Sequence, residues 1–264
     1  MGKVIGVLSL KGGVGKTSVV SALGRALSDF GKKVLLIDAN FSAPNLGMHL
    51  NIINPEHTVH HVLSRLVNPK DAVHKLDYFD VMPGAIFNNF KINPLDLKKR
   101  IKLLKERYDV VLIDSSPSLN DETLAVMLAS DEMLAVTTPD YPTLSMTLKA
   151  VKEALNRGVK ISGLILNKVH GKKFELSLEE IERTTDIPVM AVIPHDINVL
   201  KSLAEFTPST QRNPKSEAST EYKKLAATLI GEEYKPNTAR EFFRLSPRRQ
   251  DINREIFYHR TFGD

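Results

Sequence analysis

The chain contains no cysteine among its 264 residues. This absence excludes disulfides, thiolate zinc sites, cysteine nucleophiles and cysteine-ligated iron–sulfur clusters. No apolar run comes near the roughly 18 residues that a membrane-spanning helix requires. The short segment Met-Gly-Lys before the first apolar run leaves no room for a signal peptide. We therefore expect a cytoplasmic protein.

Hydrophobic residues make up 42% and charged residues 25% of the chain, which is the balance of an ordinary globular protein with a substantial core. The length fits one large α/β domain or two small ones. A formal charge of +5 makes the chain mildly basic. That charge is compatible with binding to nucleic acid or anionic lipid, but lysines on a solvated surface explain it more simply.

The most informative stretch covers residues 4–18, where an apolar run passes through a glycine-rich turn into a helical pattern. The run at 4–10 is uncharged and contains β-branched residues, as a buried parallel strand does. The glycines that follow allow successive backbone N–H groups to surround a phosphate. Lys16 supplies a charge for the β- and γ-phosphates, and the Thr17 hydroxyl can bind magnesium. The stretch therefore predicts a nucleotide site.

Strand and helix patterns alternate through the rest of the chain. The runs that predict further strands lie at 33–38, 79–82, 108–114, 132–138, 160–169 and 187–194. The periodic segments that predict helices lie at 17–30, 95–106, 143–156, 176–184 and 216–230. This alternation predicts the α/β class, as a single-domain P-loop NTPase fold with a mostly parallel, twisted sheet of about seven to eight strands and helices on both faces.

Polar residues at strand ends extend the predicted site. Two of the predicted strands end in the carboxylates Asp38 and Asp114, and a parallel sheet brings its strand ends to the same edge as the phosphate loop. Asp114 fits a magnesium ligand that acts through water. Asn167 is followed by Lys-Val-His170, where a guanine-binding protein would have Asn-Lys-x-Asp. The missing aspartate favours adenine, which an amide can read through its donor and acceptor.

The glycine-rich turn departs from the common P-loop pattern, because Leu10 stands where that pattern has its first glycine. The sequence from Lys11 to Thr17, Lys-Gly-Gly-Val-Gly-Lys-Thr, instead resembles the deviant Walker A motif of the MinD/ParA family of ATPases. In that family the first lysine, here Lys11, reaches across a dimer interface to the partner's nucleotide. A glycine-rich turn with incidental lysines is the alternative, but strand, loop and helix occur in the required order.

The resemblance covers residues 2–231 and implies ATP and Mg²⁺ as cofactors. It implies that the metal is held by Thr17, Asp38 and Asp114, and that the catalytic residues are Lys11, Lys16 and Asn40. Nucleotide contacts in the family correspond here to Gly12, Gly13, Val14, Gly15, Lys16, Thr17, Ser18, Asn167, Pro194 and Asp196. We therefore predict a MinD/ParA-like ATPase domain at residues 1–231, followed by a C-terminal tail at 232–264.

Position 40 departs from the resemblance. The family usually has a second aspartate two residues after the first, associated with the attacking water, and this chain has Asn40. An amide can orient water but cannot accept a proton. Because phosphoryl transfer depends chiefly on positioning and electrostatics, we predict slow hydrolysis and a long-lived ATP state. A tolerated natural variant and a substitution made to trap the ATP form are both compatible with the sequence.

The tail at 232–264 contains two short aromatic segments, at 239–245 and 252–262, that could form helices. Many MinD proteins end in a basic amphipathic helix that binds anionic lipid. The mixed charge of these segments is poor for such a helix, which favours Lys and Arg on its polar face. Docking on a partner or on the chain's own domain, lipid binding and disorder all remain open for the tail.

Three histidines at positions 57, 60 and 61 suggest a metal site, because two of them share a helix face. No carboxylate lies among them, and residues 60 and 61 diverge around a helix. Surface histidines are the simpler interpretation.

The resemblance implies an ATP-dependent homodimer that acts as a molecular switch. Such a switch would control the position of a division site or another cargo through a protein partner, in the cytoplasm or at the inner face of the cell membrane. The alternatives are a ParA-type partitioning ATPase that binds nucleic acid and, less favoured, a small-molecule kinase or ligase. Iron–sulfur carriers that share the loop use interface cysteines, which this chain lacks.

Overall fold

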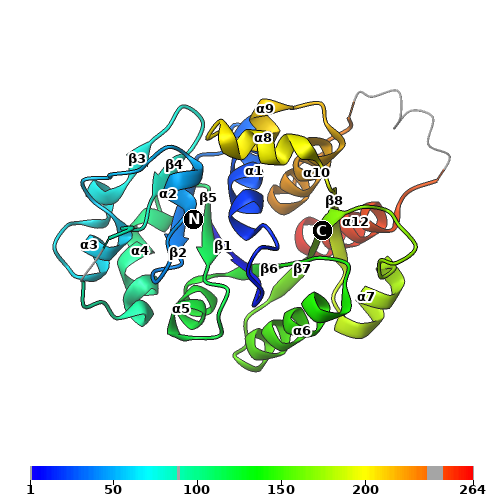
Figure 1. The fold of residues 1–264 in the computed structure, drawn as a ribbon, viewed down its shortest axis with the longest axis horizontal. Coiled ribbons are helices and arrows are strands. Elements are labelled where there is room, and N and C mark those ends of the chain that lie inside the picture. Colours follow the sequence, from blue (N-terminus) through cyan, green and yellow to red (C-terminus); the bar gives the residue numbers. More distant parts are fainter. Residues whose placement is uncertain (1, 88–89, 237–245, 264) are drawn as a thin grey trace.

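The computed structural model describes residues 2–87, 90–236 and 246–263. Its centre is an eight-stranded sheet in the order β3-β4-β2-β5-β1-β6-β7-β8, with helices on both faces (Figure 1). Neighbouring strands run parallel except for β3 and β4, which are antiparallel. The strands are β1 Lys3–Leu8, β2 Val34–Ala39, β3 His74–Lys75, β4 Asp80–Met82, β5 Val110–Ser115, β6 Glu132–Thr137, β7 Ile161–Val169 and β8 Val189–Pro194. The predicted fold class is confirmed.

The helices connect these strands and cover the sheet. The α-helices are α1 Lys16–Asp29, α2 Leu46–His49, α3 Val59–Leu63, α4 Leu97–Lys105, α5 Asp121–Ala129, α6 Tyr141–Asn156, α7 Leu178–Thr185, α8 Ile197–Ala204, α9 Ser209–Arg212, α10 Glu217–Ile230 and α12 Arg249–Phe262. Two short 3-10 helices, η1 Pro69–Ala72 and η2 Pro94–Asp96, precede β3 and α4. Helix α10 ends as predicted at Gly231, whose φ of 74° favours glycine.

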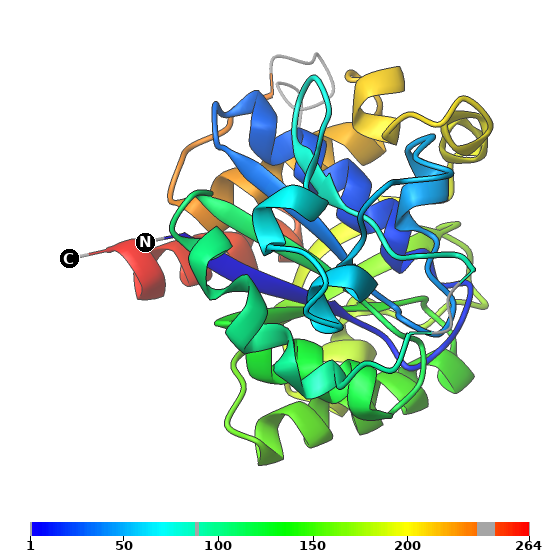
Figure 2. The same cartoon turned by 90° about the vertical axis from the view of Figure 1, so that its left-hand side faces the viewer.

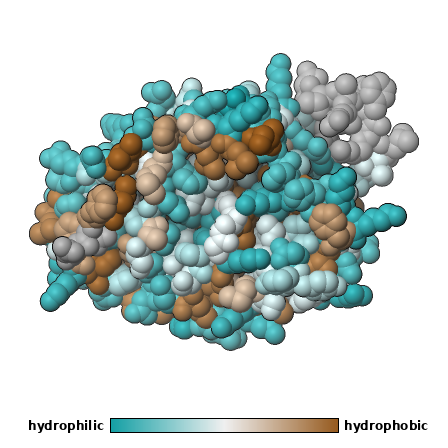
Figure 3. All heavy atoms as spheres, viewed as in Figure 1, coloured by the Kyte–Doolittle hydropathy of each residue, from teal (hydrophilic) through white to brown (hydrophobic). Residues whose placement is uncertain are grey.

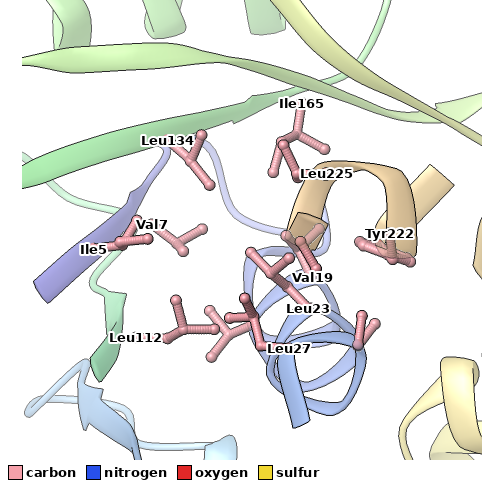
Figure 4. Packing of buried hydrophobic residues seen from close by; sticks show 14 of the residues in the cluster. Ile5, Val7, Val19, Leu23, Leu27, Leu112, Leu134, Ile165, Tyr222 and Leu225 are labelled. Atoms are coloured by element: carbon pink, nitrogen blue, oxygen red, sulfur yellow. The ribbon is translucent and has the colours of Figure 1, made fainter. Parts of the chain in front are cut away.

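Side-chain alternation along β1 divides the core into layers. Ile5 and Val7 face the cluster that contains α1 and α10, whereas Val4 and Leu8 face the cluster built from α3, α4 and α5. Figure 4 shows the first layer, with side chains of α1 and α10 pointing at the strands. A third cluster joins α6 and α7 to β6, β7 and β8. The central strands are buried on both faces, which explains their unbroken apolar runs.

The sheet topology places the predicted site residues at one edge. β1 lies between β5 and β6, and β5 lies between β1 and β2. In the strand register Asp114 pairs with Val7 on one side and with Asp38 on the other. The loop after β1, the end of β2 and the end of β5 therefore meet at the carboxyl edge of the sheet, which is where parallel α/β sheets bind ligands.

Several elements lie outside the sequence predictions. No helix was predicted for α5 or α8, and no strand for β3, which is only two residues long. The tail segment 252–262 forms most of α12, which packs against β8 and α10 and buries Phe257. The other predicted tail segment, 239–245, lies outside the described residues. None of the helices described here has the length and apolar character needed to cross a membrane.

One of the three histidines departs from the predicted surface position, whereas His57 and His61 are partly exposed. His60 is buried rather than exposed, with its ring nitrogens 3.0 Å from the Phe41 carbonyl oxygen and 3.0 Å from the Ala85 amide nitrogen. The Ala85 N–H must donate to one nitrogen, so the other carries the proton and donates to Phe41. Burial lowers the pKa of His60, as a neutral bridging ring requires. Within the described ranges no group of three or more His, Cys, Asp or Glu side chains is placed to hold a metal ion.

Candidate nucleotide site

The loop between β1 and α1 adopts the backbone geometry of a phosphate cradle. Gly13 and Gly15 have φ values of 78° and 95°, in the left-handed region. A Cβ on Gly15 would also lie 2.4 Å from Asn167 Nδ2, so glycine is needed there for two separate reasons. Lys16 and Thr17 then open α1, whose free N–H groups and positive dipole end point at the loop.

A cavity of about 340 Å³ lies against this loop. The predicted site residues that line it are Gly12, Gly13, Gly15, Lys16, Thr17, Ser18, Asn40, Asn167, Pro194 and Asp196. Four predicted residues do not line it: Val14, Asp38 and Asp114 are buried, and Lys11 lies to one side. The far wall is α8, over which apolar residues gather at the surface (Figure 3). The cavity thus runs from the phosphate loop to an apolar wall suited to a base.

The metal-binding prediction rests on a group of oxygens behind Thr17. The Thr17 hydroxyl lies 2.6 Å from Asp114 Oδ2 and 2.8 Å from Asn45 Oδ1, and its single proton can satisfy only one of them. Asp114 Oδ1 is buried and has no hydrogen-bond partner in the described part of the chain. Asp38, in the register next to Asp114, accepts hydrogen bonds from the backbone of Asn40, Asn45 and Leu46.

A bound cation would stabilise the charged forms of the carboxyl groups behind Thr17. Burial and the charge of Asp114 raise the pKa of Asp38 to about 8. Burial raises the pKa of Asp114 to about 6, against the Thr17 hydrogen bond and the charge of Lys16. Two buried carboxylates and a hydroxyl fit Mg²⁺, which prefers oxygen ligands and retains several waters. Thr17, Asp38 and Asp114 would hold the metal, whose chemistry there is to neutralise phosphate charge.

Lys16 is the buried cation of the site. It is only 8% exposed, and burial lowers its pKa while Asp114 opposes the change. A buried ammonium is costly without anionic partners. Phosphate oxygens in the loop would supply those partners.

Asn167 and Lys168 line the cavity beside the phosphate loop. Asn167 Nδ2 donates to the Val14 carbonyl at 2.7 Å, and Lys168 Nζ donates to the Gly13 carbonyl at 2.6 Å. Both residues therefore bind the phosphate loop directly. Lys168 was not predicted, although its position next to Asn167 and its φ of 59° mark it as unusual for a lysine. Asn45 was also missed, because only its contact with Thr17 reveals it.

Comparison with known proteins identifies the family. The model of the CobQ/CobB/MinD/ParA nucleotide binding domain matches residues 5–209. The chain belongs to this family. The septum site-determining protein MinD of Thermotoga maritima is 32% identical over 88% of this chain and 90% of its own.

Solved MinD structures have the same fold. The cell division ATPase MinD of Pyrococcus furiosus is 33% identical, with a TM-score of 0.82 over 86% of this chain and 97% of its own. MinD of Pyrococcus horikoshii, complexed with Mg-ADP, is 31% identical, with a TM-score of 0.82 over 87% and 96%. The chain is accordingly an ATPase of the MinD/ParA family.

The family's first lysine, Lys11, points away from the cavity. Its Nζ lies 2.6 Å from Thr143 Oγ1 and 3.5 Å from Asp140 Oδ1, at the start of α6. Asp140 caps this helix by accepting the Thr143 N–H at 2.9 Å. The Lys11 side chain is 43% exposed, so this ion pair contributes little to stability. Lys11 can leave α6 at little cost.

Asn40, at the family's usual aspartate position, lies on the cavity wall. Its Nδ2 donates to the Ala43 carbonyl at 2.6 Å, which fixes the amide plane. Its side-chain oxygen has no hydrogen-bond partner among the described residues. The side chain can therefore accept a hydrogen bond from water, but it has no carboxylate with which to take a proton.

Proposed function

We propose that the chain is an ATP-dependent molecular switch, which binds ATP with Mg²⁺, dimerises in that state and hydrolyses the nucleotide slowly. The observation that carries the proposal is the buried pair Asp38 and Asp114 beside Lys16 and Thr17. Burial disfavours the charged forms of both carboxyls and of the Lys16 ammonium, and Lys16 and Asp114 offset each other's charge only in part. A magnesium–triphosphate supplies the missing partner to each.

Dimerisation through Lys11 is supported by exposed apolar side chains in the segments that follow β5 and β6, at the same edge of the sheet. Tyr141, next to Asp140 in the chain, is 72% exposed, and Leu119, in the loop after β5, is 42% exposed. Large apolar side chains at a surface favour contact with another molecule. A second copy of the chain, facing the cavity, would cover them and receive Lys11 at its own nucleotide.

The switch would control the position of a cellular structure through a protein partner that binds only the ATP-bound dimer. The γ-phosphate and its metal would order the loops after β2 and β5, as in other nucleotide switches. Hydrolysis would then release the partner. The division site, or another cargo, is the structure whose position would be controlled.

The test is size-exclusion chromatography with light scattering in ADP and in ATP, with phosphate release measured in parallel. We expect a monomer in ADP and a dimer in ATP. Lys11→Ala should bind nucleotide but remain monomeric, whereas Lys16→Ala should lose nucleotide binding. A wild-type protein that stays monomeric with ATP bound would refute the switch. A phosphorylated small molecule as product would instead identify a kinase.

A further inference from the structure

A groove of about 560 Å³ lies between α4 and the turn from α5 to β6, on the side of the molecule that faces the viewer in Figure 2. Its rim consists of four lysines: Lys98, Lys99, Lys102 and Lys105. Its floor is apolar, formed by Val4, Ile101, Ala129 and the partly exposed Leu95. Val4 is the second residue of β1 and Asp131 precedes β6, so the groove lies at the amino edge of the sheet, opposite the nucleotide cavity.

The charge of the groove is not neutralised by the residues that the structure describes. Asp131 is the one carboxylate among the described lining residues, and it is already paired with Lys105 at 2.6 Å and with the Val4 N–H at 2.8 Å. Lys98, Lys99 and Lys102 are exposed and form no ion pair with any residue in the described ranges. Three lysine ammonium groups therefore surround an apolar floor without partners.

Only half of this arrangement suits the stability of α4, because Lys102 and Lys105 lie in its last turn, where cations are favoured, and the other two lysines do not. Lys98 and Lys99 lie in its first turn, at the positive end of the helix dipole, where acidic residues are favoured and none is present. Lys98 and Lys102 are also four residues apart, a spacing at which like charges repel. A helix under selection for stability alone would have carboxylates at these positions.

We propose that the groove is a docking site for an acidic amphipathic segment of a partner protein. The lysines would pair with its carboxylates, and its apolar side chains would cover the floor beside Leu95. The mixed lining favours a peptide over nucleic acid. None of the lining residues has an aromatic side chain on which a base could stack, and the apolar floor would not interact favourably with phosphate. The lining also disfavours a membrane, because the groove is concave and its apolar surface lies below the lysines.

The test uses fluorescence anisotropy with a labelled helical peptide of leucine and glutamate as the probe. We expect saturable binding that weakens with ionic strength, and an affinity about tenfold lower for the variant Lys99→Glu/Lys102→Glu. The matched control is Lys149→Glu/Lys152→Glu, which has the same charge change and the same spacing on the exposed face of α6. The control should bind like the wild-type protein. Leu95→Ser should also weaken binding.

Three results would overturn the proposal. The first is no saturable binding of the probe at low ionic strength, and the second is equal loss in the two double-lysine variants. The third is equal binding by a peptide whose leucines are replaced by serine, by duplex DNA or by anionic vesicles, since that would identify a surface for polyanions in general. Nucleotide binding, measured on the same variants, should be unchanged, so failure here is distinguishable from failure of the nucleotide switch.

Discussion

Replacing Asp114 with asparagine should stabilise the metal-free protein and abolish its response to magnesium. Burial raises the pKa of this carboxyl from 3.8 to about 6, because its charged form is poorly solvated. The folded protein therefore binds the proton more tightly than the unfolded chain does. Stability falls as pH rises from about 4 to about 6 and stays low above that. The shift corresponds to about 3 kcal/mol at pH 8.

Asparagine keeps the shape of the side chain and an oxygen that can accept the Thr17 hydroxyl, but it has no charge to bury. For a chain of this size, 3 kcal/mol corresponds to a rise in melting temperature of about 6–12 °C. The charge of Asp114 repels the charged form of Asp38, so removing it also lowers the pKa of Asp38. This change adds to the increase in stability of the variant. The difference between variant and wild type should shrink toward zero near pH 4.

Thermal unfolding followed by circular dichroism, in chelator and across this pH range, measures the effect. Burial lowers the pKa of His49 and His60, so their contributions to stability rise with pH up to their unfolded pKa. Both proteins contain these histidines, so the difference between them isolates Asp114. Asp77→Asn, at an exposed position, is the control for the change in net charge.

The wild-type protein should gain stability from Mg·ADP over ADP alone, and Asp114→Asn should not. A variant that melts below the wild type at pH 8 in chelator would refute the reasoning about buried charge. An equal response of the two proteins to Mg·ADP would refute the assignment of the metal to this oxygen group.

The remaining predictions concern three other positions. Asn40→Asp should raise the rate of phosphate release severalfold, by restoring a carboxylate on the cavity wall, and an unchanged rate would contradict the account of slow hydrolysis. Glu221→Gln should cost about 3 kcal/mol in urea unfolding, because it removes the buried carboxylate that pairs with Arg254 at 3.1 Å and with Arg248. Arg254 keeps Asp251 as an anionic partner, so the cost lies at the lower end for a broken buried pair. Easier proteolysis of α12 should accompany that loss. Gly15→Ala should abolish ADP binding by calorimetry, since its Cβ would collide with Asn167; retained binding would mean that the loop can move.

The predictable part of the structure depended on local signals. Residues 4–18 contain their strand, turn and helix in one continuous pattern, and the resulting cradle agrees with the prediction. Asp38 and Asp114 could be placed together because both end buried runs and parallel sheets align such ends. Helix α5 was missed because it is buried on more than one side, with both Ala125 and Met127 covered although they lie on different faces, so it has no single narrow apolar stripe.

The unpredictable part depended on contacts between distant residues. Lys11 meets Thr143 across 132 positions of sequence, and no local pattern indicates that α6 receives the lysine. Glu122 binds the backbone N–H of Ser42 at 2.9 Å across 80 positions, which ties the loop after β2 to α5. Propensity and periodicity describe neighbours along the chain. Such links become visible only once the sheet order is known.

Asn40 lies apart from the pair Asp38 and Asp114, so a change at position 40 should affect hydrolysis of ATP without affecting its binding. Asp38 and Asp114 are buried behind Thr17, and on our proposal they would together carry the charge that Mg²⁺ neutralises. Asn40 instead lines the open cavity, where water and the γ-phosphate would meet. Loss of a carboxylate there leaves the metal's ligands intact and removes a negative charge close to the phosphate. Nucleotide affinity should therefore be preserved while water activation suffers, which favours a long ATP-bound state over a failure to bind.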